Sequence, residues 1–266
     1  MKTHTQSNIL LTAALGLACI LSSTGILQAL PIFVPNHSFE SQSAVGFPFD
    51  TNPTLDAWQK IAEPAYYPFL GGGVPPWYGT SGGFRNISVY NPAPYGNVVG
   101  AQAGYILMAP QVTLFQDYST SPTHDFNATF DIGKSYNMTI GLFAKSSFGI
   151  IPPGSTLELS LYYLDDLANK VKVGSTVVSY SAADFPLTPT LNLIDYQVNV
   201  PVVNPGDAWA GKNIGIHLES TIAVEMTSFG NWDFDNVRLT AVPEPTAMAL
   251  LGIGISGMIL ARSRRS

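Results

Sequence analysis

Few residues in this chain have the types and spacing that catalysis requires. Three of the four histidines, His37, His124 and His217, lie far apart and lack the His-x-x-x-His spacing typical of a zinc site. The single cysteine, Cys19, lies in an apolar stretch near the N-terminus, so the rest of the chain has no thiol nucleophile and no disulfide. We therefore expect a protein that is not an enzyme.

A second kind of chemistry is offered by aromatic residues in the Gly- and Pro-rich stretch 63–96. An exposed aromatic ring can stack on the apolar face of a sugar, while nearby polar groups bind the sugar hydroxyls. Aromatic side chains beside Pro and Gly cannot all reach a core, so some are expected at the surface. The candidates for sugar stacking are Trp77, Tyr78, Tyr66 and Tyr67.

The distribution of charge argues against a nucleic-acid partner. The chain has 12 basic and 18 acidic residues, and its formal net charge is −6. Residues 30–240 alone carry 8 basic and 17 acidic groups, which gives −9. This part of the chain would repel a phosphate backbone, and no basic patch interleaved with aromatic residues compensates for that.

The elements that must position these residues are predicted to be β-strands. Apolar and polar side chains alternate in several segments, and Pro, Gly, Asn and Asp fill the gaps between them. The segments with this alternation are 136–144, 156–164, 196–200, 213–219 and the vicinity of 112–115. Such alternation is typical of antiparallel sheets that bury one face. We expect residues 30–240 to form an all-β ectodomain, an antiparallel two-sheet sandwich.

The N-terminal segment, residues 1–29, is predicted to be a secretory signal peptide. It contains Lys2, an apolar run from Ile9 to Leu21 and small residues before Ala29, after which we expect cleavage. The apolar run is too short to span a bilayer comfortably as a helix, since spanning takes about 20 residues. The pattern predicts a signal helix and export by the general secretory route.

The C-terminal segment, residues 241–266, is predicted to sort and anchor the protein. The sequence Val242-Pro243-Glu244-Pro245-Thr246 precedes an apolar stretch, 247–261, and then basic residues at 262–265. The apolar stretch is expected to form a short transmembrane helix, with the arginines on the cytoplasmic side.

This order of motif, apolar stretch and basic terminus resembles the PEP-CTERM sorting signal. The resemblance implies that Pro243, Glu244 and Pro245 are the sorting motif and that a membrane-embedded exosortase is the partner that recognises it. It also implies a protein held in the membrane by its C-terminal helix until it is sorted to the cell surface or the extracellular matrix. The resemblance identifies an address and not an activity.

Two short signatures near the ends of the ectodomain resemble those of jelly-roll carbohydrate-binding modules and galactose-binding-like domains. The first, VPNHSFE at 34–40, is followed by Trp58, and the second is WDFDNVRLT at 232–240. The resemblance implies a jelly-roll sandwich in which the first and last strands lie together.

In proteins of that kind a structural calcium ion often ties these strands. The positions that match its ligands are Glu40 and Asp235, with Asp233 a weaker candidate, and backbone carbonyls are expected to complete the shell of oxygen ligands that calcium prefers. The alternative is that Glu40 is a surface carboxylate and Asp235 caps a turn.

Together these features predict an exported surface or matrix protein that binds polysaccharide without cleaving it. One alternative is a purely structural or glycan-decorated surface protein. Another is a glycoside hydrolase, because paired carboxylates can cleave glycosides and Glu158, Glu219 and Glu225 lie on or near patterned strands.

Overall fold

The computed structural model describes most of the ectodomain. The described residues are 28–41, 49–50, 54–55, 57–67, 82–86, 98–120, 123–146, 151–185, 193–223 and 230–244. Residues from Leu30 to Ala241 belong to one compact unit. The predicted signal helix and the predicted transmembrane helix lie outside the described residues. Within the described segments, no helix is long and apolar enough to cross a membrane.

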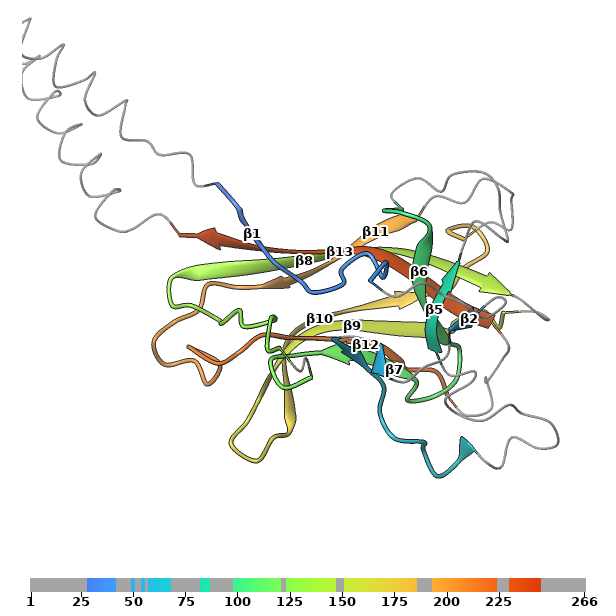
Figure 1. The fold of residues 1–266 in the computed structure, drawn as a ribbon, viewed down its shortest axis with the longest axis horizontal. Coiled ribbons are helices and arrows are strands. Elements are labelled where there is room, and N and C mark those ends of the chain that lie inside the picture. The colour runs from blue at the N-terminus through green and yellow to red at the C-terminus, as the bar shows by residue number, and fades with distance from the viewer. Residues whose placement is uncertain are drawn as a thin grey trace, which may run out of the picture. The chain divides into compact units, whose positions relative to one another are not determined.

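The described strands form two antiparallel sheets (Figure 1). The first contains β1 (Leu30–Ile32), β2 (Phe49–Asp50), β5 (Gly82–Asn86), β6 (Gln102–Leu107), β8 (Lys134–Ser146), β11 (Ile194–Val200) and β13 (Gly230–Pro243). The second contains β3 (Thr54–Leu55), β4 (Trp58–Gln59), β7 (Thr113–Gln116), β9 (Thr156–Leu164), β10 (Lys170–Ser179) and β12 (Gly215–Ser220). The orders are β11-β8-β13-β6-β5-β2, with β1 also on β13, and β10-β9-β12-β7-β4-β3. The predicted all-β, two-sheet fold is confirmed.

The core lies between the two sheets and is built by alternate residues of the long strands. In β8 the inward residues from Tyr136 to Ala144 are buried, and in β9 the odd-numbered residues from Leu157 to Tyr163 are buried. Ile216 and Leu218 of β12 are buried from the same side. Each large apolar side chain moved from water into such a core stabilises the fold by about 1.5–3 kcal/mol.

Several strands were not predicted from the sequence, among them β2, β3, β4, β5, β6 and β10. Strand β5 lies inside the Gly- and Pro-rich stretch, which we expected to be irregular, and Gly82 of β5 lies opposite Ile106 of β6. A Cβ atom at Gly82 would lie 2.7 Å from the carbonyl oxygen of Tyr105, so the glycine permits close strand approach. Strand β10 pairs with β9 along its whole length, with a register shift between Lys172 and Gly174.

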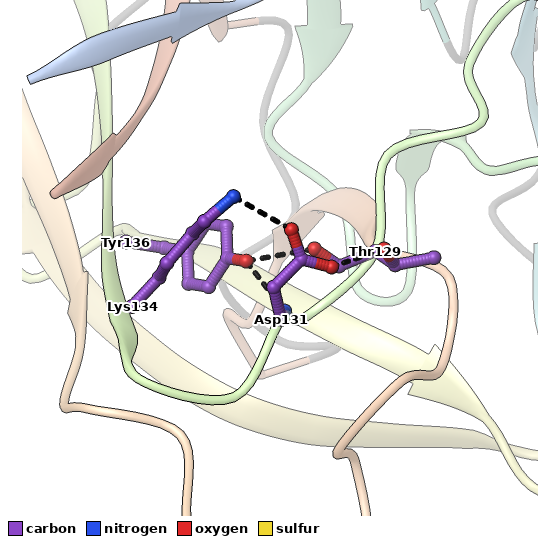
Figure 2. Close-up of polar contacts among 4 residues, drawn as sticks. All are labelled: Thr129, Asp131, Lys134 and Tyr136. Atoms are coloured by element: carbon purple, nitrogen blue, oxygen red, sulfur yellow. Dashed lines mark hydrogen bonds and ion pairs between the residues drawn. The ribbon is translucent and has the colours of Figure 1, made fainter. Parts of the chain in front are cut away.

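A polar network fixes the turn that leads into β8 (Figure 2). The Tyr136 hydroxyl donates to the Thr129 carbonyl at 2.8 Å and accepts from the Asp131 amide at 2.6 Å. The Asp131 carboxylate accepts from Thr129 Oγ1 at 2.6 Å and from Lys134 Nζ at 2.8 Å. These bonds lower the pKa of Asp131, and its carboxylate in turn raises the pKa of Lys134. The turn is therefore held by side chains as well as by backbone.

The first and last strands of the unit lie side by side, as the resemblance implied. In β1 and β13, Leu30 is opposite Ala241 and Ile32 is opposite Leu239, in antiparallel register. The start of β1 and the end of β13 therefore lie together, so the chain enters and leaves this unit at the same end of β13.

Candidate functional site

The first signature forms a tight loop that is hydrogen-bonded to β4 of the second sheet and to β13 of the first sheet. Asn36 and Phe39 have left-handed backbone conformations, with φ of 46° and 58°. The side-chain Oδ1 of Asn36 accepts from the Ser41 amide at 3.0 Å, and the backbone carbonyl of Asn36 accepts from Trp58 Nε1 at 3.1 Å. The amide of Val237, in the second signature, donates to the His37 carbonyl at 2.9 Å. The two signatures are thus parts of one structural junction.

Glu40 and Asp235 hold the same short segment, residues 99–102, from its two ends. Glu40 Oε1 accepts from the amides of Ala101, at 2.9 Å, and Gln102, at 2.6 Å. Asp235 Oδ2 accepts from the Val99 amide at 2.7 Å. Between them, Gly100 has φ of +88°, and a Cβ atom there would lie 2.4 Å from the Glu40 side chain. The two predicted ligands are therefore brought to one place.

The buried carboxylate of Asp235 has hydrogen bonds to only one of its two oxygens among the described residues. Its side chain is 0% exposed, and Oδ1 has no hydrogen-bond partner among the described residues. Burial raises the pKa of Asp235 to about 7, and the charge of Glu40 adds to this rise. A buried carboxylate oxygen without a donor, beside a second carboxylate, fits a hard cation such as Ca²⁺.

Asp233 is placed differently from the other two candidate ligands. It is buried, and its Oδ1 accepts from Asn231 Nδ2 at 2.7 Å. In the described part of the chain, no three His, Cys, Asp or Glu side chains form a group suited to a metal ion. A cation held by Glu40 and Asp235 would therefore need carbonyl or water oxygens to complete its shell.

A second polar cluster, not predicted as a site, lies on the face of the second sheet that is turned away from the core. Because β9 and β12 are antiparallel neighbours, Ser160 lies opposite His217 and Glu158 lies opposite Glu219. Phe115 of β7 lies opposite His217 on its other side. We call the cluster of Phe115, Glu158, Ser160, Tyr162, Lys170, His217 and Glu219 the outer-face cluster.

Tyr162 is fixed in this cluster by contacts on two sides. Its hydroxyl donates to Asp117 Oδ2 at 2.5 Å. Its ring lies directly over Gly215, where a Cβ atom would come within 2.3 Å of it. Burial, reinforced by the Asp117 charge, raises the pKa of Tyr162, so the phenol stays protonated and donates to the carboxylate.

Lys170 covers the aromatic part of the outer-face cluster. Its Nζ lies 2.9 Å from the ring centroid of Phe115 and 5.3 Å from that of Tyr162. Cation–π contacts of this kind stabilise a partly desolvated ammonium group. Burial nevertheless lowers the pKa of Lys170 to about 8, against the opposing effect of Asp117 and Glu219.

The polar groups beside these rings keep unused hydrogen-bonding capacity. Burial, followed by the charges of Lys170 and Lys172, lowers the pKa of His217 to about 3, so its imidazole is neutral at pH 7. Ser160 Oγ is buried and has no hydrogen-bond partner among the described residues. Burial raises the pKa of Glu219, and the Glu158 charge adds to the rise. The cluster thus combines aromatic rings with a neutral imidazole, a hydroxyl and carboxylates.

The sorting segment overlaps the last residues of β13. Pro243 is the last residue of β13, and Glu244 after it is exposed. Pro245, the third residue of the predicted motif, lies outside the described residues.

Residues 241–265 match the PEP-CTERM protein-sorting motif. The PEP-CTERM motif indicates a secreted protein with a C-terminal sorting signal, generally anchored in the membrane before processing, and it implies processing by an exosortase. A comparison with curated proteins found no match.

Several solved structures are similar in fold to this chain. A cyclase from Fischerella sp. TAU has 17% sequence identity and a TM-score of 0.54, covering 82% of this chain and 100% of that chain. The same organism's cyclase in complex with 4-(1H-indol-3-yl)butan-2-one has 18% identity and a TM-score of 0.54, with the same coverage. The CBM22-1 xylan-binding domain of Paenibacillus barcinonensis Xyn10C has 10% identity and a TM-score of 0.38, covering 74% of this chain and 94% of that one. At these identities, the similarity to the cyclases extends to the fold alone.

The aromatic residues predicted for sugar stacking in this chain fall into two groups. Trp77 and Tyr78 lie outside the described residues. Tyr67 is 3% exposed and packs in the core, so its ring has no free face. Tyr66 is half-buried, donates its hydroxyl to the Pro110 carbonyl and meets Tyr67 edge to face, with ring centroids 6.3 Å apart. The described part of this stretch therefore contributes packing.

Proposed function

We propose that this protein is exported, sorted by an exosortase, and binds polysaccharide through the outer-face cluster without cleaving it. The PEP-CTERM match supports the sorting part of this proposal. The observation that carries the binding part is the placement of His217, Glu219 and Phe115, all partly exposed, on one outer face of neighbouring strands.

A sugar offers hydroxyl groups that both donate and accept hydrogen bonds, and C–H groups that contact aromatic rings. Neutral His217, whose side chain is partly exposed, has one donor and one acceptor nitrogen. Glu158 and Glu219 add acceptors on the same face. A polar, uncharged ligand with many hydroxyls therefore suits this cluster better than a nucleic acid or an apolar molecule.

We also propose a structural calcium ion at Glu40 and Asp235. Bound there, the ion would neutralise the buried Asp235 carboxylate. Glu40 and Asp235 would hold the ion. Their hydrogen bonds to the amides of residues 99–102 would keep the segment that leads into β6 in place. This role is separate from the outer-face cluster.

The binding proposal is tested with the full-length chain purified in detergent and a panel of insoluble polysaccharides. We expect at least one polysaccharide to retain the protein, and His217→Ala to weaken retention about tenfold, because it removes a central hydrogen-bonding group. Ile132→Ala is the matched control, since Ile132 is exposed at the turn before β8. Absence of retention by every polysaccharide would overturn the proposal and leave a purely structural surface protein.

A second candidate function is glycoside hydrolysis, favoured by one observation. Glu158 and Glu219 lie opposite each other on β9 and β12, and burial raises the pKa of Glu219 against the opposing charge of Lys172, as suits a general acid. If the protein releases reducing sugar from the same panel and Glu219→Gln abolishes this release, the function is hydrolysis and not binding alone. We expect no such release.

A further inference from the structure

An exposed pair of stacked aromatic rings lies at the end of β7, next to the outer-face cluster. The rings of Tyr118 and His124 are nearly parallel, with centroids 4.4 Å apart and an interplanar angle of 14°. Tyr118 is 42% exposed, and His124 is exposed as well. Large aromatic side chains are usually buried, so a surface pair of this kind contributes little to the core.

The backbone around Tyr118 is held by Asp117. One oxygen of the Asp117 carboxylate accepts from the amide of Ser119 at 2.8 Å and from its hydroxyl at 2.5 Å. The other oxygen accepts from Tyr162 of the outer-face cluster. Thr120 Oγ1 accepts from the Asp117 amide at 3.0 Å and donates to the Ala57 carbonyl at 2.8 Å. The turn that carries Tyr118 is thus tied to the cluster by one shared carboxylate.

His124 is fixed against Tyr118 by its own backbone geometry. Its φ of 54° is in the left-handed region, which residues other than glycine seldom adopt. Its Nδ1 lies 2.6 Å from the Tyr118 carbonyl oxygen, a hydrogen bond that holds the imidazole over the phenol ring. The pair is therefore ordered before any ligand arrives, which lowers the entropic cost of binding.

We infer that Tyr118 and His124 form a stacking platform for a neutral sugar residue of the polysaccharide bound at the outer-face cluster. The inference rests on the proposed function and extends it to a ligand class and a second point of contact. Each ring uses one face in the pair, so the opposite faces are left for the C–H groups of a pyranose ring.

Charge decides between neutral and acidic sugars. The nearest ionised groups on this segment are Asp117 and the exposed Asp125, whose carboxylate also accepts from Thr123 Oγ1 at 2.7 Å. Residues 30–240 carry a net charge of −9. The two carboxylates of this segment outnumber the one ammonium group of the outer-face cluster, Lys170, which interacts with Asp117, and the overall charge is negative. The charge balance therefore opposes a polyanionic ligand, whereas carboxylates accept hydrogen bonds from neutral hydroxyl groups.

The experiment measures the affinity of the full-length chain in detergent for neutral and uronic-acid polysaccharides. Tyr118→Ala should weaken binding of the neutral polymer at least tenfold, and Tyr118→Phe should stay within about twofold, because it keeps the ring. The matched control is Phe33→Ala, which removes a 69% exposed aromatic ring far along the chain from the platform. The melting temperatures of all three variants should equal that of the wild type.

The outcomes separate this inference from the proposed function. If Tyr118→Ala binds like the wild type while His217→Ala does not, the platform is refuted and the proposed function stands. A preference for the uronic-acid polymer refutes the ligand class. Failure of the wild type to bind any polysaccharide overturns both.

Discussion

The rings of Phe39 and Phe234 meet edge to face, with centroids 5.4 Å apart, although 194 positions separate them in the sequence. Phe39 also contacts Trp58 and Phe84, at 5.3 Å each. One ring of the first signature therefore packs against residues from β4, β5 and β13. This explains physically why the two signatures occur together: they build the same part of the core.

Replacing Phe39 with alanine should destabilise the protein by about 3–5 kcal/mol, the usual cost of removing a buried phenylalanine. The free energy of unfolding by chemical denaturant measures this. Phe33→Ala, six residues earlier and exposed, should change stability by less than about 0.5 kcal/mol. Equal effects of the two substitutions would contradict the junction described above.

Calcium should raise the thermal stability of the protein, and EDTA should remove the effect. An ion that binds only the folded state contributes about 2.7 kcal/mol at a hundredfold excess over its dissociation constant. Asp235→Asn and Glu40→Gln should each abolish the shift. Asp131→Asn, at a partly exposed carboxylate in the β8 turn, is the control and should keep it. A shift that persists in Asp235→Asn would place the ion elsewhere.

Stability should fall as the pH is lowered from about 6.5 toward 3, in part because of His217. In the unfolded chain its pKa returns to about 6.5, whereas in the fold it is about 3. Between these values the unfolded state binds more protons, so acid favours unfolding by up to about 1.4 kcal/mol per pH unit. His217→Gln should reduce the slope of unfolding free energy against pH in this window. His37→Gln, at an exposed position, is the matched control.

Gly215 should not tolerate alanine, because the new Cβ atom would meet the ring of Tyr162. The expected displacement breaks the hydrogen bond to Asp117, and leaving that buried group unsatisfied costs about 1–3 kcal/mol. Gly206→Ala, where nothing lies within 4 Å, should be neutral in the same denaturation experiment. Tyr162→Phe should reproduce the loss of the hydrogen bond without the steric clash.

The sequence predicted β8 and β9 well, because the alternation of apolar and polar residues in each strand indicates which face is buried. Alternation over 156–164 required only neighbouring residues to be compared, and β9 spans Thr156–Leu164. Strand β10 was missed because its side chains are mostly half-buried or exposed, which weakens the apolar signal. Strand β5 was missed because Gly82 and Gly83 indicated a loop, whereas close strand packing is the reason for Gly82.

The two candidate sites differ in how much of each could be predicted from the sequence. Glu40 and Asp235 were found through signatures, since the chain motif around each is short and contiguous. The outer-face cluster depends on register: Phe115, Ser160 and His217 become neighbours only when three strands pair in one alignment. A shift of one residue would turn each side chain to the other face of the sheet. Glu158 and Glu219 were considered from the sequence, but their direct opposition required the structure.

The course of β13 determines how the ectodomain would respond to mechanical load. This strand runs between β8 on one side and β6 and β1 on the other, and the sorting segment continues directly from its end. A load carried by that segment would enter the fold through β13. Because β13 is paired with neighbours on both sides, its release would require breaking two sets of backbone hydrogen bonds, whereas an edge strand would have to break only one.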